Sequence, residues 1–297
     1  AIPTYYVSEI ARRSVTVALN GDGGDEGLLG YQRYAAFASK RARVIAGSAG
    51  RELVAATINR LPGSVRRAHG IAAICRQLER PSGSPSRDYE QFIAYFSHAA
   101  KADIYGPHLA EHLARSSLGG LDRYLRATPE PAGAAAWADI HTYLPDDLLV
   151  KVDIASMAHG LECRSPLLDQ DLIEWATTLP SEARLSGGET KSLLKLAMEP
   201  FLPRALLYRP KMGFGVPIDR WIRGPMRDFV YATLLEGPAR GRGLFQLEKV
   251  RTLLDEHCRG IGNAPRIWAL LMLELWLQMW IDGPVPSRPS PVSTARL

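Results

Sequence analysis

Apolar side chains recur at helical spacing along most of this chain, and only one short β-branched run is typical of a strand. That run, Val15 to Val17, predicts a strand over residues 14–20. Longer helices are predicted over residues 4–13, 26–46, 51–60, 64–79, 88–100 and 144–159. A further helix begins after Asp169, which we expect to cap it. Shorter helices are predicted over 191–198, 203–207, 227–235 and 247–257.

The last predicted helix, residues 266–281, is strongly apolar, carries three tryptophans and is expected to lie in the core. Beyond it, the Pro/Ser-rich residues 284–297 predict a disordered tail, which leaves residues 1–283 as one domain. One strand cannot form a sheet by itself. We therefore predict a predominantly helical α/β fold, with one strand followed by a helical bundle, whose sheet begins upstream. The first residues, AIPTYY without an initial Met, favour a fragment.

Composition narrows the function classes. Lys and Arg total 36 against 31 Asp and Glu, which gives a net charge of +5 and suits a phosphorylated ligand. No basic tract alternates with aromatic residues, so a nucleic-acid partner is not expected. No apolar run approaches the length of a membrane span, and the first residues do not resemble a signal peptide, so neither a membrane span nor a signal peptide is expected. The three cysteines lack metal-site spacing, which favours free thiols in a reducing cytoplasm.

Candidate chemistry gathers in the segment VTVALNGDGGDEGLLGY, residues 15–31. A strand runs into a glycine-rich loop with the carboxylates Asp22, Asp25 and Glu26, and a helix follows. Ligands of α/β sheets bind where a strand ends and its loop enters a helix. Carboxylates there would repel a phosphate unless Mg²⁺ lay between, so the loop predicts a magnesium–nucleotide site. The alternative is an exposed turn whose carboxylates cap the helix.

Three ordered blocks resemble the asparagine synthetase family. The loop ALNGDGGDEGLLGYQRY is similar to that family's strand, Ser-Gly-Glu/Asp-Gly-x-Asp-Glu loop and Gly-Tyr helix. LPDDLLVKVDIASMAHGLECRSPLLD, residues 144–169, resembles the second block, and KSLLKLAMEPFLPRALLYRPKMGFGVP, residues 191–217, the third. Together they extend over about two-thirds of the chain, which is far more specific than one motif.

The resemblance implies the C-terminal portion of a Rossmann-like adenine nucleotide α-hydrolase domain, also called a PP-loop ATP pyrophosphatase domain. It implies ATP and Mg²⁺ as cofactors. It assigns Asp25 to the metal and Asp22 to catalysis, at the position of a family Glu that helps form the acyl-adenylate or accept a proton. Nucleotide-binding positions implied by the first block are Asn20, Gly21, Gly23 and Gly24.

The other two blocks contribute further candidates. Asp153 and Glu162 could line a pocket for an amine or carboxylate, since an attacking amine needs a carboxylate base. For the neighbouring Arg164 and Asp169, ion pairs that position the helix are the favoured interpretation. Lys191 stands at the position of the family's pyrophosphate lysine, where a mobile charge can follow a leaving group.

Three further charges in the third block have lesser assignments. Lys195, one turn after Lys191, is expected to be peripheral. Arg209 and Lys211 could shield phosphates or order a lid.

The implied function is ATP-dependent amide ligation. Aspartate is activated as an acyl-adenylate and then amidated with ammonia from a glutaminase domain. The family's upstream Ser-Gly-Gly-x-Asp-Ser loop and the glutaminase cysteine are not in this sequence, so we expect the chain alone to be inactive. Two alternatives stay open: a relative that amidates or cyclises another carboxylic acid, as β-lactam synthetases do, or a non-catalytic helical binding module. A homodimer is also left open.

Overall fold

The computed structural model describes residues 1–46, 84–114, 120–209 and 215–283. These residues form two compact units. The first unit comprises residues 1–46, 84–93, 120–209 and 215–216, and the second comprises residues 94–114 and 217–283. The predicted helices 51–60 and 64–79, the predicted tail, Cys75 and Lys211 lie outside the described residues.

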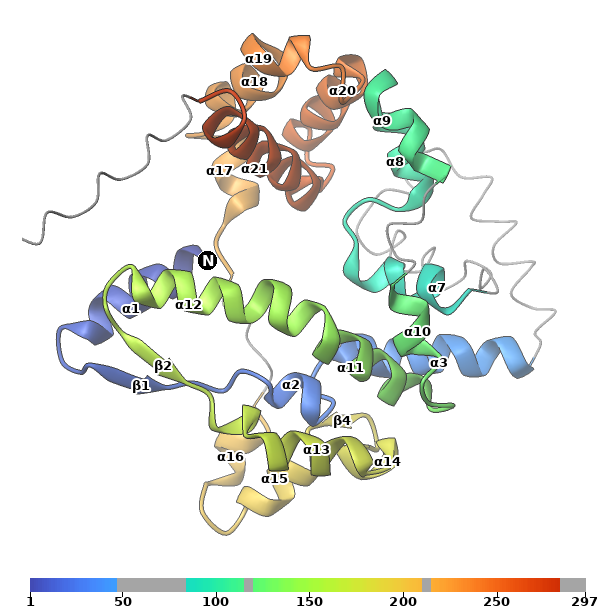
Figure 1. The fold of residues 1–297 in the computed structure, drawn as a ribbon, viewed down its shortest axis with the longest axis vertical. Helices are drawn as coiled ribbons and strands as arrows, with labels where there is room; N and C mark the ends of the chain where they lie inside the picture. Colours follow the sequence, from blue (N-terminus) through green and yellow to red (C-terminus); the bar gives the residue numbers. More distant parts are fainter. Residues whose placement is uncertain (47–83, 115–119, 210–214, 284–297) are drawn as a thin grey trace, which may run out of the picture. The chain divides into compact units, whose positions relative to one another are not determined.

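The first unit is mostly helical and contains every candidate site residue that the structure describes (Figure 1). Its helices before residue 142 are α1 (Ile2–Arg12), α2 (Gly24–Gly27), α3 (Gln32–Ala46), α7 (Pro85–Ile93), α10 (Leu121–Leu125) and α11 (Pro131–His141). Its later helices are η2 (Leu144–Leu149), α12 (Val150–Met157), η3 (Pro166–Leu168), α13 (Gln170–Thr178), α14 (Ser181–Arg184), α15 (Ser192–Met198) and α16 (Arg204–Leu207). Its strands are β1 (Val17–Leu19), β2 (Glu162–Arg164), β3 (Leu185–Ser186) and β4 (Glu189–Thr190).

The predicted strand exists, but the expectation that it stands alone in this chain is wrong. β1 pairs in parallel with β2, with Val17 opposite Glu162 and Leu19 opposite Arg164. The two run side by side in Figure 1, and α12 packs against both α1 and β2. β2 escaped prediction because it has only three residues, two of them charged, and so short a run is no strand signal by itself. A short antiparallel pair, β3 with β4, precedes α15.

Three predicted helices are divided or irregular in the structure. The helix expected over 26–46 is divided into α2 and α3, because Leu29 adopts a left-handed backbone (φ 55°) and Gly30 follows it. The helix expected over 144–159 begins as the π-helical segment η2 and becomes regular only in α12. In the predicted helix 88–100, α7 ends at Ile93, and Ser97 caps the next helix instead. Asp169 caps α13 as predicted, accepting a hydrogen bond from the Leu172 backbone.

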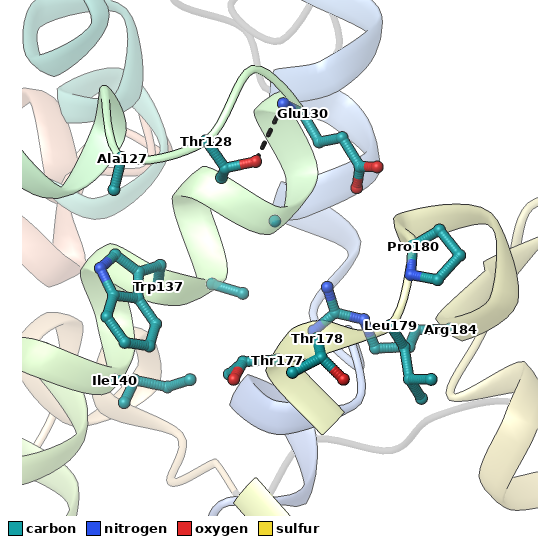
Figure 2. Close-up of a pocket in the computed structure, with 12 residues that line it drawn as sticks. Ala127, Thr128, Glu130, Trp137, Ile140, Thr177, Thr178, Leu179, Pro180 and Arg184 are labelled. Atoms are coloured by element: carbon teal, nitrogen blue, oxygen red, sulfur yellow. Dashed lines mark hydrogen bonds between the residues drawn. The ribbon is translucent and has the colours of Figure 1, made fainter. Parts of the chain in front are cut away.

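A cavity of about 480 Å³ opens between α11 and the segment that joins α13 to α14 (Figure 2). Its walls combine apolar side chains with hydroxyl groups and two opposite charges.

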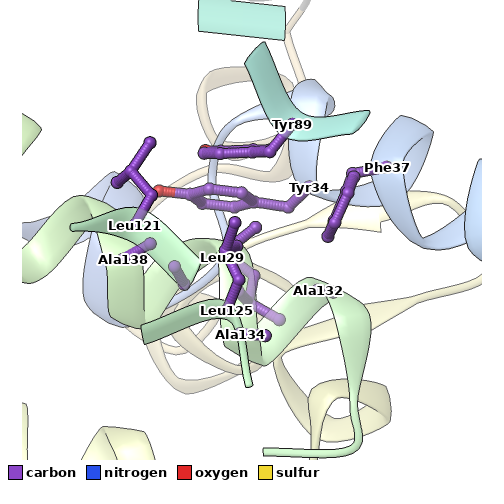
Figure 3. Packing of buried hydrophobic residues seen from close by; sticks show 11 residues of the cluster. Leu29, Tyr34, Phe37, Tyr89, Leu121, Leu125, Ala132, Ala134 and Ala138 are labelled. Carbon is purple, nitrogen blue, oxygen red and sulfur yellow. The ribbon is translucent and has the colours of Figure 1, made fainter. Parts of the chain in front are cut away.

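The core of the first unit gathers α3, α7, α10 and α11 (Figure 3). Tyr34, Phe37 and Tyr89 are fully buried there, and Phe37 and Tyr89 contact edge to face. One polar group sits among them. The carboxylate of Asp139, 1% exposed, accepts hydrogen bonds on Oδ2 from Tyr34 Oη at 2.7 Å, Tyr89 Oη at 2.8 Å and Arg33 Nη2 at 2.7 Å. This hub ties three helices together at a single buried charge.

The second unit contains helices and one isolated β-bridge, Tyr105 with Phe245, among its described residues. Its helices are α8 (His98–Ile104), α9 (Pro107–Ala110), η1 (Glu111–Ala114), α17 (Ile218–Arg223), α18 (Arg227–Leu235), α19 (Gly237–Gly241), α20 (Leu247–Cys258) and α21 (Ala264–Trp280). α21 joins the core through Ile267 and Leu271, as expected of it. Two of its three tryptophans, Trp276 and Trp280, are exposed rather than buried in the core. Among the described helices, none combines the length and hydropathy that a membrane span requires.

Candidate active site

The acidic loop, residues 20–25, leaves the carboxyl end of β1 and enters α2. The preceding strands hold it in place, because the Asn20 N–H donates to the carbonyl of Arg164 at 2.9 Å and extends the parallel pairing. The Asn20 side chain then accepts from the Asp22 N–H at 3.2 Å and from Ser165 Oγ at 2.5 Å. Asn20 therefore fixes the shape of the loop. Ser165, which sequence reasoning missed, supports it from the end of β2.

Glycine is required at the centre of the loop. Gly23 has φ of 84°, a left-handed backbone that a side chain rarely tolerates, and it stands at the N-terminus of α2. A Cβ atom on Gly23 would also collide with the side chain of Leu168 in η3. Gly21 is different, because a Cβ there meets nothing within 4 Å. Leu168, from the second block, therefore packs against Gly23 in the loop of the first block.

Asp25 and Lys191 bring the first and third blocks together. Lys191 Nζ lies 3.1 Å from Asp25 Oδ1, and the side chains are 25% and 22% exposed, respectively. Gly30 makes room for this ion pair, since a Cβ on it would collide with Asp25 Oδ1 and Lys191 Cε. Lys191 itself has φ of 54° and precedes α15. A non-glycine residue held in that region costs about 1–3 kcal/mol, and such strain clusters at functional sites.

Two neighbouring carboxylates, Asp22 in the loop and Glu26 in α2, hold protons more tightly than usual. Burial raises the pKa of Asp22, with Asp25 adding to the shift and Lys151 opposing it. Glu26 is 1% exposed, and burial likewise raises its pKa although Tyr31 Oη donates to its carboxylate at 2.9 Å. Carboxylates with raised pKa values are suited to proton transfer.

Electrostatics also reveal a cation near the loop that sequence reasoning did not single out. Lys151, at the start of α12, is close enough to Asp22 to lower its pKa. The only sign of it in the sequence was its place in the second block.

The remaining candidates are not joined to the loop. Asp153 is exposed on α12, and Glu162 at the start of β2 forms an exposed ion pair with Arg164 at 2.7 Å. Across the described ranges, neither carboxylate makes a hydrogen bond or ion pair to residues 20–25. Arg164 forms an ion pair as expected, but with Glu162 of its own strand rather than with a helix, and Asp169 acts as a helix cap. Arg209 is exposed and follows α16.

No cluster of three or more His, Cys, Asp or Glu side chains suited to a metal occurs among the residues that the structure describes. Mg²⁺ does not require one, since it is commonly held by one or two carboxylates together with phosphate oxygens and water. A single carboxylate such as Asp25, together with phosphate oxygens and water, fits that pattern.

Comparison with known proteins gives a consistent picture. The family model described as asparagine synthase matches residues 1–278. The protein named "Putative asparagine synthetase (glutamine-hydrolyzing)" in Mycobacterium tuberculosis is 30% identical over 292 residues, covering 96% of this chain and 42% of that protein. "Asparagine synthetase (glutamine-hydrolyzing) 1" of Bacillus subtilis is 28% identical over 291 residues, covering 95% of this chain and 43% of that protein. The chain thus spans about two-fifths of the length of these relatives. No solved structure gives a significant match.

Proposed function

The chain belongs to the asparagine synthase family, and on that premise we propose that it carries the ATP-dependent part of an amide-forming ligase. The proposed reaction activates the side-chain carboxylate of aspartate and amidates it with ammonia released from glutamine. We also propose a Rossmann-like PP-loop fold for the first unit. The parallel pairing of β1 with β2, and the placing of the acidic loop at their carboxyl ends, support that fold.

In the proposed site, ATP lies against the backbone of residues 20–24, and Asp25 is the Mg²⁺ ligand, with Asp22 beside it. Bound Mg²⁺ would neutralise part of the phosphate charge. Asp25 is suited to this role because Lys191 keeps its carboxylate paired. An arriving cation would take over that pairing, which frees the ammonium of Lys191 for a phosphate.

The chemistry has two steps. A carboxylate oxygen of the acid attacks the α-phosphorus of ATP, the bond to the β-phosphate breaks, and pyrophosphate leaves. Lys191 stabilises the charge that develops on this leaving group. Ammonia then attacks the acyl carbon, AMP departs with the bonding electrons, and the nitrogen loses a proton.

Asp22 is the favoured proton acceptor, because its pKa is raised and it lies in the loop itself. Asp153 and Glu162 are retained as proposed residues of the amine or carboxylate pocket, and Arg209 and Lys211 as proposed phosphate or lid residues. Asp153, Glu162 and Arg209 have no described contact with residues 20–25, and Lys211 lies outside the described residues.

The observation that carries the proposal is the ion pair between Asp25 and Lys191, which joins two blocks separated by more than half of the chain. The test uses the full protein that contains this sequence and measures ATP–pyrophosphate exchange with aspartate. Asp25→Asn should abolish exchange while the thermal midpoint falls by only about 2–4 °C, through loss of the pair with Lys191. Asp171→Asn, an exposed carboxylate in the first turn of α13, is the control and should exchange like the wild type.

Two outcomes would contradict the proposal. Exchange at the wild-type rate in Asp25→Asn would remove the metal assignment. Exchange that depends on another carboxylic acid, with none on aspartate, would keep the ligase chemistry and replace the substrate.

A further inference from the structure

The cavity between α11 and the α13–α14 segment has the size and lining of a ligand site, and none of its lining residues belongs to the acidic loop (Figure 2). Its volume of about 480 Å³ is within the range of small-molecule pockets. The lining residues are Ala127, Thr128, Glu130, Gly133, Ala136, Trp137, Ile140, Thr177, Thr178, Leu179, Pro180 and Arg184. Only two of them are charged, and the charges are opposite.

Arg184 supplies a buried cation. A hydrogen bond to α2 holds its side chain in place, because Nη1 donates to the carbonyl of Gly27 at 3.1 Å. The residue is only 3% exposed, yet its buried Nε has no hydrogen-bond partner in the described part of the chain. Figure 2 shows the guanidinium reaching into the space between Trp137 and Pro180. A buried donor without a partner is costly, and a carboxylate is the acceptor that a guanidinium binds best.

Glu130 supplies the anion. Its Oε2 accepts from the Ser181 N–H at 2.9 Å and from Ser181 Oγ at 2.5 Å, and these bonds lower its pKa, so the carboxylate is ionised. In the described residues no ion pair joins Glu130 to Arg184. Both nevertheless border Gly133, where a Cβ would lie 3.7 Å from Glu130 Oε2 and 3.7 Å from Arg184 Nη2. The two charges therefore flank one gap and leave it open.

We propose that this cavity binds an α-amino acid with an apolar side chain, in its zwitterionic form. The carboxylate of the ligand pairs with Arg184, and its ammonium group pairs with Glu130. A wall that carries one charge of each sign attracts a neutral zwitterion, whereas a simple anion is repelled by Glu130 and a simple cation by Arg184. The side chain of the ligand packs against Trp137 and Ile140, which offer apolar surface.

Binding of L-leucine and L-phenylalanine to the chain by isothermal titration calorimetry tests the inference. L-Leucine should bind at least tenfold more tightly than 4-methylpentanoate, which lacks the ammonium group, and than 3-methylbutylamine, which lacks the carboxylate. L-Aspartate should bind more weakly than L-leucine because its second carboxylate would be buried among apolar groups. If neither L-leucine nor L-phenylalanine binds, or if the two analogues match L-leucine, the inference is wrong.

Gly133→Ala fills the gap with little disturbance to the fold. The new methyl group would be in ordinary contact with both charged side chains, and alanine suits a helix better than glycine. The thermal midpoint should therefore stay equal or rise, while affinity for L-leucine falls at least tenfold. Gly120→Ala is the matched control, since a Cβ there meets nothing within 4 Å, and it should bind L-leucine normally. Equal affinity in Gly133→Ala and wild type would overturn the proposal.

Glu130→Gln separates charge from packing. The amide oxygen can still accept from Ser181, but the ammonium partner is lost. Affinity for L-leucine should fall at least tenfold, while affinity for 4-methylpentanoate should rise because a repulsion is removed. Glu182→Gln, exposed on α14, should change neither. A uniform loss for both ligands would contradict the proposed pairing.

The result is independent of the proposed ligase function. Asp25→Asn should bind L-leucine like the wild type, because Asp25 does not line the cavity. Loss of leucine binding in that variant would place the ligand in the acidic loop and refute this inference, whatever the outcome of the exchange assay.

Discussion

Replacing Lys191 with methionine separates a catalytic lysine from a structural one. The substitution removes the ion pair to Asp25, which is about one-quarter exposed on each side. Pairs at such depth contribute about 1 kcal/mol to stability, well below the cost of breaking a fully buried pair. A loss of that size lowers the melting temperature by about 2–4 °C in a chain of this length. The fold should therefore survive.

The expected effect on catalysis is larger. A charge that stabilises the departing pyrophosphate acts mainly in the transition state, and removal of one preorganised group of this kind lowers the rate about 10²-fold. That factor corresponds to about 2.7 kcal/mol, which exceeds the stability change. In the full protein, kcat and kcat/KM should fall together while KM for aspartate changes little. Steady-state kinetics and thermal unfolding of the same preparation measure both quantities.

Two companion variants sharpen the test. Lys195→Met removes the neighbouring lysine, which pairs with Glu189 and lies over the Tyr208 ring, so it should lose similar stability but stay within a few-fold in activity. Lys191→Gly removes the same charge as Lys191→Met and relieves the left-handed backbone. It should melt no lower than Lys191→Met, with the same loss of activity. If Lys191→Met keeps activity near that of Lys195→Met, the pyrophosphate assignment is refuted.

Three further expectations concern the fold around the site. Asp139→Ala should destabilise the chain by about 3–5 kcal/mol in urea titrations, because Arg33 would be left as an uncompensated, largely buried charge; a change below about 1 kcal/mol would show that the hub is dispensable. Glu26→Gln should be more stable than wild type at pH 7, and the difference in stability should vanish below about pH 4.5. Because the pKa of Glu26 is raised by folding, the folded state keeps the Glu26 proton at pH values where the unfolded state has lost it. The stability of the wild type therefore falls as the pH rises from about 4.5 toward 7. A difference that stays constant with pH would contradict that reasoning. Gly23→Ala should lower the melting temperature because of its positive φ and the contact with Leu168, whereas Gly21→Ala should not.

The sequence predicted β1 and most helices because their apolar periodicity is local. β2 could not be predicted from Glu162 and Arg164, since its strand geometry comes from pairing with β1 rather than from its own residues. The helix break at Leu29 could not be predicted either. Leu29 is apolar and fits the helical spacing of its neighbours in the sequence, yet its backbone is left-handed in the structure. The exposure of Trp276 shows the converse, since apolar character alone does not determine which helix face is buried.

For the site, the closeness of Asp25 and Lys191 was implied by the family resemblance and by nothing in their spacing. The roles of Ser165 and Lys151 depend on tertiary contacts with Asn20 and Asp22, respectively, which sequence spacing does not predict. The cavity charge Arg184 is a similar case. It looks like any surface arginine in the sequence, and only the folded chain buries it and supplies the Gly27 carbonyl to which it donates.

The hub at Asp139 gives the first unit an optical signature in alkaline solution. Burial and the nearby Asp139 charge raise the pKa of both Tyr34 and Tyr89, so these phenols keep their protons as long as the core is closed. The unfolded chain releases the same protons above about pH 10, and stability therefore declines there. Ionised tyrosine absorbs at longer wavelengths than the neutral ring. The ultraviolet absorbance of Tyr34 and Tyr89 should therefore shift only when the helices of the core separate, and that shift records the opening of the core without any added probe.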